Sequence, residues 1–151
     1  GISSKKETLK LKINTYNPLI STFSDHWDKG RFSSSKWDKV INVDTTTLDQ
    51  LINDYGHPRY IKIDVEGFEL EVLKGLTKKT GIISFEFTSE FFKDAIKCLD
   101  YLNKLGYKKF NYSEGERKKF NFNWTSKDKI LEEIENKIKT NNYLWGDIYA
   151  Q

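Results

Sequence analysis

The fold of this chain is decided by residues 60–76, which read YIKIDVEGFELEVLKGL. At the start of this stretch apolar β-branched residues alternate with other residues, which is typical of a β-strand. From Phe68 onward the apolar residues fall at helical intervals, with Phe68, Val72 and Leu76 on one face. We therefore predict a strand at 60–64, a short turn, and a helix that begins directly after it.

Two acids stand where the predicted strand ends, Asp64 and Glu66. In an open α/β sheet, ligands bind at the carboxyl ends of the strands and in the loops that follow them. Carboxylates at such a position cost free energy unless they are solvated, paired or used by the protein. The pair therefore predicts a functional site, although it does not by itself define the reaction.

The rest of the chain alternates between predicted strands and helices. We expect further strands at 9–13, 40–43, 81–87, 107–112 and 145–150, and helices at about 48–56, at 89–105, and around Ile130, Ile134 and Ile138. Thr47 and Gln50 have the spacing of a capping box, in which Gln50 reaches back to the helix start. Strands separated by single helices predict βαβ units and a largely parallel sheet.

Length and composition indicate a single soluble domain over residues 1–151. The 25 basic and 22 acidic residues give a net charge of +3 without a long basic block, which argues against a nucleic-acid binder. No apolar run approaches the length of a membrane span, and we expect no signal peptide. Cys98 is the one cysteine, so no internal disulfide is possible, and a reducing, cytoplasmic location is expected.

Four segments together resemble the FkbM-type methyltransferases: TLDQLI at 47–52, IKIDVEGFELEVLKG at 61–75, ISFE at 83–86 and WGDIYA at 145–150. The resemblance covers about Val40 to Ala150. It implies an S-adenosylmethionine-dependent O-methyltransferase whose acceptor is a hydroxyl of a sugar, glycan or secondary metabolite. It also implies the Rossmann-like class I methyltransferase fold, a mostly parallel α/β sheet with helices on both faces and an antiparallel last strand.

The chain departs from that family at its start. Members open with a strand, a glycine-rich turn and a helix that hold the cofactor, then a second strand that ends in an acid for the ribose. Before position 56 the only glycines are Gly1 and Gly30. We therefore expect the C-terminal portion of the fold, without the N-terminal cofactor-binding strands, so the cofactor-binding residues are not identified.

Three expectations follow from this departure. The chain alone should bind S-adenosylmethionine weakly. The strand at 60–64 should form an open edge, which requires either an upstream segment or self-association. A non-catalytic α/β binding or scaffold remnant stays open as the alternative function.

The resemblance implies that Asp64 and Glu66 are catalytic, by orienting or deprotonating the acceptor hydroxyl. The alternative is that Asp64 caps the next helix while Glu66 favours its positive end. Glu86 ends the neighbouring strand, and His26 lies beside Asp25 in a loop, so both are candidates for substrate binding. Two carboxylates without a nearby histidine are a thin ligand set, and we expect no metal.

Overall fold

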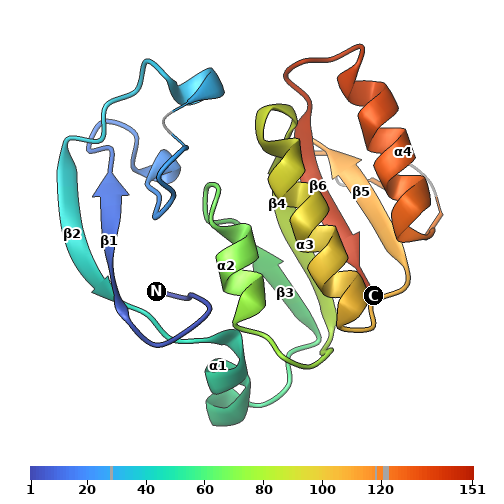
Figure 1. The fold of residues 1–151 in the computed structure, drawn as a ribbon, viewed down its shortest axis with the longest axis horizontal. Helices are drawn as coiled ribbons and strands as arrows, with labels where there is room; N and C mark the ends of the chain where they lie inside the picture. Colours follow the sequence, from blue (N-terminus) through green and yellow to red (C-terminus); the bar gives the residue numbers. More distant parts are fainter. Residues whose placement is uncertain (28, 118, 121–122) are drawn as a thin grey trace. The chain divides into compact units, whose positions relative to one another are not determined.

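The computed structural model describes residues 1–27, 29–117, 119–120 and 123–151 (Figure 1). The chain forms two compact units. The first contains Gly1–Gly56 and Asp64–Leu76, and the second contains His57–Ile63 and Thr77–Gln151. Each unit is described by itself below.

The first unit contains a two-stranded antiparallel sheet of β1 (Thr8–Ile13) and β2 (Lys39–Asp44). These strands were expected to join a largely parallel sheet, but they pair with each other. The described residues of the connection between them form two single-turn 3-10 helices, η1 (Pro18–Ile20) and η2 (Gly30–Phe32), and no α-helix. The crossover between parallel strands is usually an α-helix, whereas antiparallel strands can be joined without one.

Two α-helices complete the first unit, α1 (Leu48–Tyr55) and α2 (Glu69–Lys74). Thr47 is the N-cap of α1, as predicted, and its hydroxyl accepts the N–H of Gln50 at 3.1 Å. The Gln50 side chain does not reach back. It donates to Asp54 Oδ1 at 2.8 Å, one turn further along the helix. The buried apolar residues of this unit are Ile20, Trp27, Leu48, Val72, Leu73 and Leu76.

The second unit contains a four-stranded sheet in the order β3-β4-β6-β5. Its strands are β3 (Tyr60–Ile63), β4 (Ile82–Thr88), β5 (Phe110–Glu114) and β6 (Trp145–Ala150). β3 and β4 are parallel, whereas β6 is antiparallel to both β4 and β5. The fold is therefore α/β with a mixed sheet rather than a mostly parallel one. The physical reason is the last strand, which lies between β4 and β5 and replaces one parallel ladder with two antiparallel ladders.

Helices α3 (Phe92–Lys104) and α4 (Lys127–Ile138) pack on β4 and β5 respectively and contact each other. Both therefore lie on one face of this sheet (Figure 1), whereas helices on both faces were expected. The core beneath them contains Ile83, Phe85, Phe87, Cys98, Leu99, Leu102, Phe110, Tyr112, Ile130, Ile134 and Ile148. Because side chains alternate along a strand, Ser84 and Glu86 face the other side. In the described part of the chain, no helix is long and apolar enough to cross a bilayer.

Candidate active site at the end of strand β3

The loop between β3 and α2 has an unusual backbone. Glu66 has φ of 54° and Gly67 has φ of 87°, so two consecutive residues adopt left-handed conformations. Glu66 is the only non-glycine residue with positive φ among the described residues. A left-handed non-glycine residue costs about 1–2 kcal/mol, and strained residues of this kind cluster at functional sites. The strain marks the loop as a site that the surrounding structure holds in place.

Contacts within the first unit hold this loop. The Glu69 carboxylate accepts hydrogen bonds from the backbone N–H groups of Val65 at 3.3 Å and Gly67 at 3.2 Å. The Thr22 hydroxyl donates to the Glu66 carbonyl oxygen at 2.5 Å. Trp27, which is 3% exposed, packs directly against Gly67. These contacts hold the backbone of the loop on both sides of Glu66.

The first turn of α2 does not use Asp64 as a cap. The N-cap of α2 is Phe68, and no side-chain capping hydrogen bond forms there. The capping alternative for Asp64 is therefore wrong. Asp64 is exposed immediately after β3, where its carboxylate can contact a ligand.

Two carboxyl groups, Glu66 in the loop and Glu69 at the start of α2, have pKa values near neutral pH. Burial raises the pKa of Glu66 to about 7, and the negative charges of Asp64 and Glu69 add to this rise. The interaction with the Trp27 side chain opposes it. Burial likewise raises the pKa of Glu69 to about 7, against the hydrogen bonds from the backbone. A carboxyl group with such a pKa can take up and release a proton at physiological pH.

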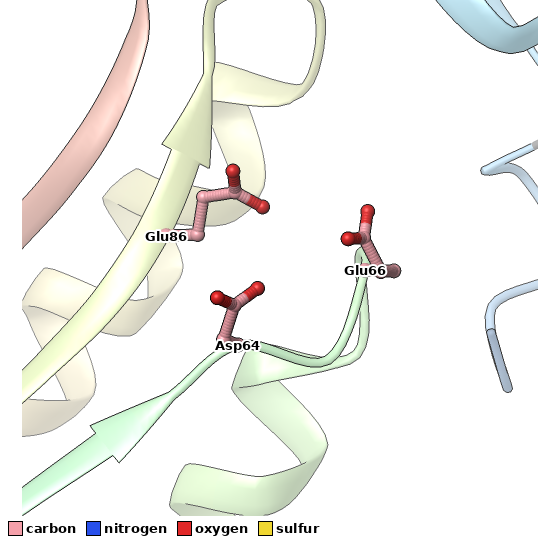
Figure 2. A group of neighbouring side chains, drawn as sticks. All are labelled: Asp64, Glu66 and Glu86. Atoms are coloured by element: carbon pink, nitrogen blue, oxygen red, sulfur yellow. The ribbon is translucent and has the colours of Figure 1, made fainter. Parts of the chain in front are cut away.

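Two carboxylates of the first unit lie close together in this loop. Asp64 and Glu66 each offer one carboxylate oxygen, and these two atoms lie within 4.8 Å of each other (Figure 2). Figure 2 also draws Glu86, which belongs to β4 of the second unit and follows Phe85, the partner of Ile63 in the β3–β4 ladder. Oxygen ligands at this spacing can hold a hard divalent cation, or they can orient a hydroxyl group.

A further acid, Asp147, lies beside Glu86 in the sheet of the second unit. Glu86 pairs in register with Asp147 of β6, and the Asp147 carboxylate lies 3.7 Å from the Lys62 ammonium group. Sequence reasoning did not single out Asp147 or Glu69 as site residues. Asp147 lies within the WGDIYA motif, and that motif was the signal that could have found it. Nothing in the local sequence indicated the burial of Glu69.

His26 is not part of this carboxylate group. It is exposed, and its backbone N–H donates to Ser24 Oγ at 3.3 Å. The neighbouring Asp25 interacts with Lys12 at 3.0 Å, and this hydrogen bond lowers the pKa of Asp25. The Asp25 carboxylate is therefore engaged by Lys12, and the role of His26 in substrate binding stays a prediction.

The raised pKa values predict a pH-dependent stability. The folded state binds a proton at Glu69 more tightly than the unfolded chain, so the free energy of unfolding should fall as pH rises from about 5 to about 8. The contribution of Glu69 is at most about 3 kcal/mol. Glu69→Gln keeps a side-chain acceptor for the two N–H groups but cannot ionise. In urea denaturation it should be more stable than the wild type at pH 8 and no more stable at pH 4.5.

The matched control is Glu135→Gln on the exposed side of α4. This variant should retain the wild-type dependence of stability on pH. An equal pH dependence in the wild type and in Glu69→Gln would show that ionised Glu69 carries no penalty in the folded protein.

Comparison with models of protein families gives a match for this chain. The model of the methyltransferase FkbM domain matches residues 1–109. The match includes the whole β3–α2 loop and Glu86, whereas the WGDIYA segment lies beyond it. No curated protein and no solved structure matches the chain.

Proposed function

Because the chain belongs to the methyltransferase FkbM domain family, we propose that it carries the acceptor-activating part of an S-adenosylmethionine-dependent O-methyltransferase. The proposed acceptor is a hydroxyl group of a sugar or a secondary metabolite. The observation that carries the proposal is Glu66, a carboxyl group with a pKa of about 7 in the loop after β3, beside the carboxylate of Asp64.

The reaction defines what these carboxylates must do. Methyl transfer forms a carbon–oxygen bond as the carbon–sulfur bond of the donor breaks, and the hydroxyl proton has to leave. Glu66 in its ionised form accepts that proton, and Asp64 accepts a hydrogen bond from the hydroxyl and fixes its direction. S-adenosylmethionine supplies the electrophilic methyl group on a positively charged sulfur. The negative charges of the cluster suit that positive charge.

The adenine and the ribose of the cofactor also need residues that bind them. Among the described residues, none is identified that would hold the adenine and the ribose, and residues 1–55 contain only Gly1 and Gly30 as glycines. A close approach of backbone to the cofactor needs a glycine-rich turn at a helix start. This observation favours the second candidate function, a non-catalytic α/β binding or scaffold role.

Binding of the methyl donor separates the two functions. In calorimetry, the natural full-length protein that contains this chain should bind S-adenosylmethionine with one-to-one stoichiometry. Residues 1–151 alone should bind it much more weakly. With labelled donor, the full-length protein should transfer the methyl group to an acceptor in a pool of sugars and hydroxylated metabolites.

Two results would contradict the enzyme. If the full-length protein does not bind S-adenosylmethionine at millimolar concentration, the scaffold role is supported instead. If the label appears on nitrogen or carbon rather than oxygen, the hydroxyl acceptor is wrong.

A further inference from the structure

A second site lies at the opposite end of the sheet in the second unit. An open pocket of about 760 Å³ is lined by residues that precede β3, β4 and β5, together with Gln151 after β6. Four of these residues carry a fixed positive charge, Arg59, Lys79, Lys108 and Lys109, and His57 also lines the pocket. No aspartate or glutamate side chain is among its lining residues. We call this cavity the amino-end pocket.

The topology explains why these cations meet. β3, β4 and β5 run in one direction, so the residues before each strand emerge at the same edge of the sheet. The backbone there is well held. The N–H of Ile82 donates to the Arg59 carbonyl at 2.9 Å, and Lys109 and Gln151 exchange backbone hydrogen bonds at 3.1 and 2.9 Å. The backbone at Arg59 and Lys109 is therefore held in place by hydrogen bonds.

These cations differ from several other lysines of the second unit, which have acidic partners. Lys97, Lys127, Lys129 and Lys137 all form ion pairs with nearby acids. Across the described part of the chain, no ion pair with Asp or Glu involves Arg59, Lys79, Lys108 or Lys109. Lys79 lies over the Tyr107 ring at 5.1 Å, and Lys108 donates to the Asn103 carbonyl at 3.0 Å and to its side chain at 3.2 Å. Like charges that line one pocket repel each other, and an anionic ligand would relieve that repulsion.

The amino-end pocket is separate from the carboxylate site. Ile82 lines the pocket, and the candidate site residue Glu86 lies four residues further along β4. At the rise of a β-strand, this is about 13 Å. One edge of the sheet is thus basic and the other is acidic, so one anionic group cannot serve both sites.

We propose that the amino-end pocket binds a small ligand that bears at least two phosphate groups. Arg59 can hold a phosphate through two parallel hydrogen bonds, and the lysines act as point charges for further oxygens. The volume exceeds that of a single phosphate and lies in the range of small-molecule sites. Pro58 and Ile82 add an apolar wall for the organic part of the ligand. The four cations line one pocket, and a compact site of this kind favours a compact polyanion over a nucleic-acid strand.

The test uses inorganic pyrophosphate and orthophosphate as probes in calorimetry at low ionic strength. Pyrophosphate should bind in the micromolar range, more tightly than orthophosphate, and added salt should weaken its binding. The double variant Arg59→Gln/Lys109→Gln should weaken pyrophosphate binding at least about tenfold, because each lost charge-assisted hydrogen bond contributes to affinity. Lys93→Gln, an exposed residue in the first turn of α3, should bind like the wild type.

Both altered positions are exposed, so the double variant should keep the thermal midpoint of the wild type. Equal pyrophosphate affinity in the double variant and in Lys93→Gln would overturn the proposal. Affinity for single-stranded oligonucleotides that grows with length and exceeds that for pyrophosphate would also overturn it, and would identify a nucleic-acid surface. If the double variant is unfolded, the proposal rests on the wild type, where equal binding of both probes would refute it.

Discussion

Asp64→Asn and Glu66→Gln should each lower turnover of the full-length protein about a hundredfold or more, with little change in cofactor affinity. Both substitutions keep the size of the side chain and most hydrogen bonds, but they remove the charge that orients or deprotonates an acceptor. Turnover should be measured together with the free energy of unfolding on the same purified variants. Glu135→Gln on α4 should retain wild-type turnover.

Stability distinguishes a catalytic role from a structural one. The ionised Glu66 carboxylate is partly buried near Asp64 and Glu69, so Glu66→Gln should not destabilise the protein at pH 8. Loss of turnover without loss of stability supports the catalytic assignment. Unchanged turnover in both Asp64→Asn and Glu66→Gln would end it.

Gly67→Ala should lower the free energy of unfolding by about 3 kcal/mol or more. An added Cβ would lie 2.6 Å from Cε3 of Trp27, and the φ of 87° is unfavourable for any other residue. Trp27 is nearly fully buried and packs on Phe32 with ring centroids 5.4 Å apart, so it cannot move aside. Urea denaturation measures the loss.

Gly56→Ala is the matched control for this prediction. Gly56 has nearly the same φ, 92°, but nothing lies within 4 Å of an added Cβ. Its substitution should cost only about 1 kcal/mol, the penalty of the left-handed backbone. A double-mutant cycle with Trp27→Ala should show that much of the extra cost of Gly67→Ala disappears when the ring is removed. Equal losses for the two glycines would show that the contact with Trp27 is not what requires Gly67.

Gly146 shows why a motif residue can be needed for packing alone. A Cβ on Gly146 would clash with the Ser113 carbonyl oxygen of the adjacent strand β5. The WGDIYA segment therefore combines a glycine that lets two strands approach closely with an acid, Asp147, on the face that Glu86 shares. The sequence presented these two residues as one motif, and only the strand pairing separates their roles.

The sequence by itself determined the local structure around the site. The change from alternating to helical spacing at 60–76 correctly predicted β3, the turn and α2, because periodicity reports the local backbone conformation. The same reasoning predicted α3, although it begins at Phe92 after a separate 3-10 turn, Ser89–Phe91. The strand expected at 107–112 is β5, Phe110–Glu114, because its ends are set by pairing with β6.

Only the tertiary structure decided which distant residues meet and how they are charged. The position of β6 between β4 and β5, and the pairing of β1 with β2, depend on contacts far apart in the sequence, which local patterns do not encode. The pKa values of Glu66 and Glu69 near 7 depend on burial and on neighbouring charges. The amino-end pocket likewise exists because three strands of one direction bring Arg59, Lys79 and Lys109 to one edge. The spacing of these residues along the chain could not show that they line the same pocket.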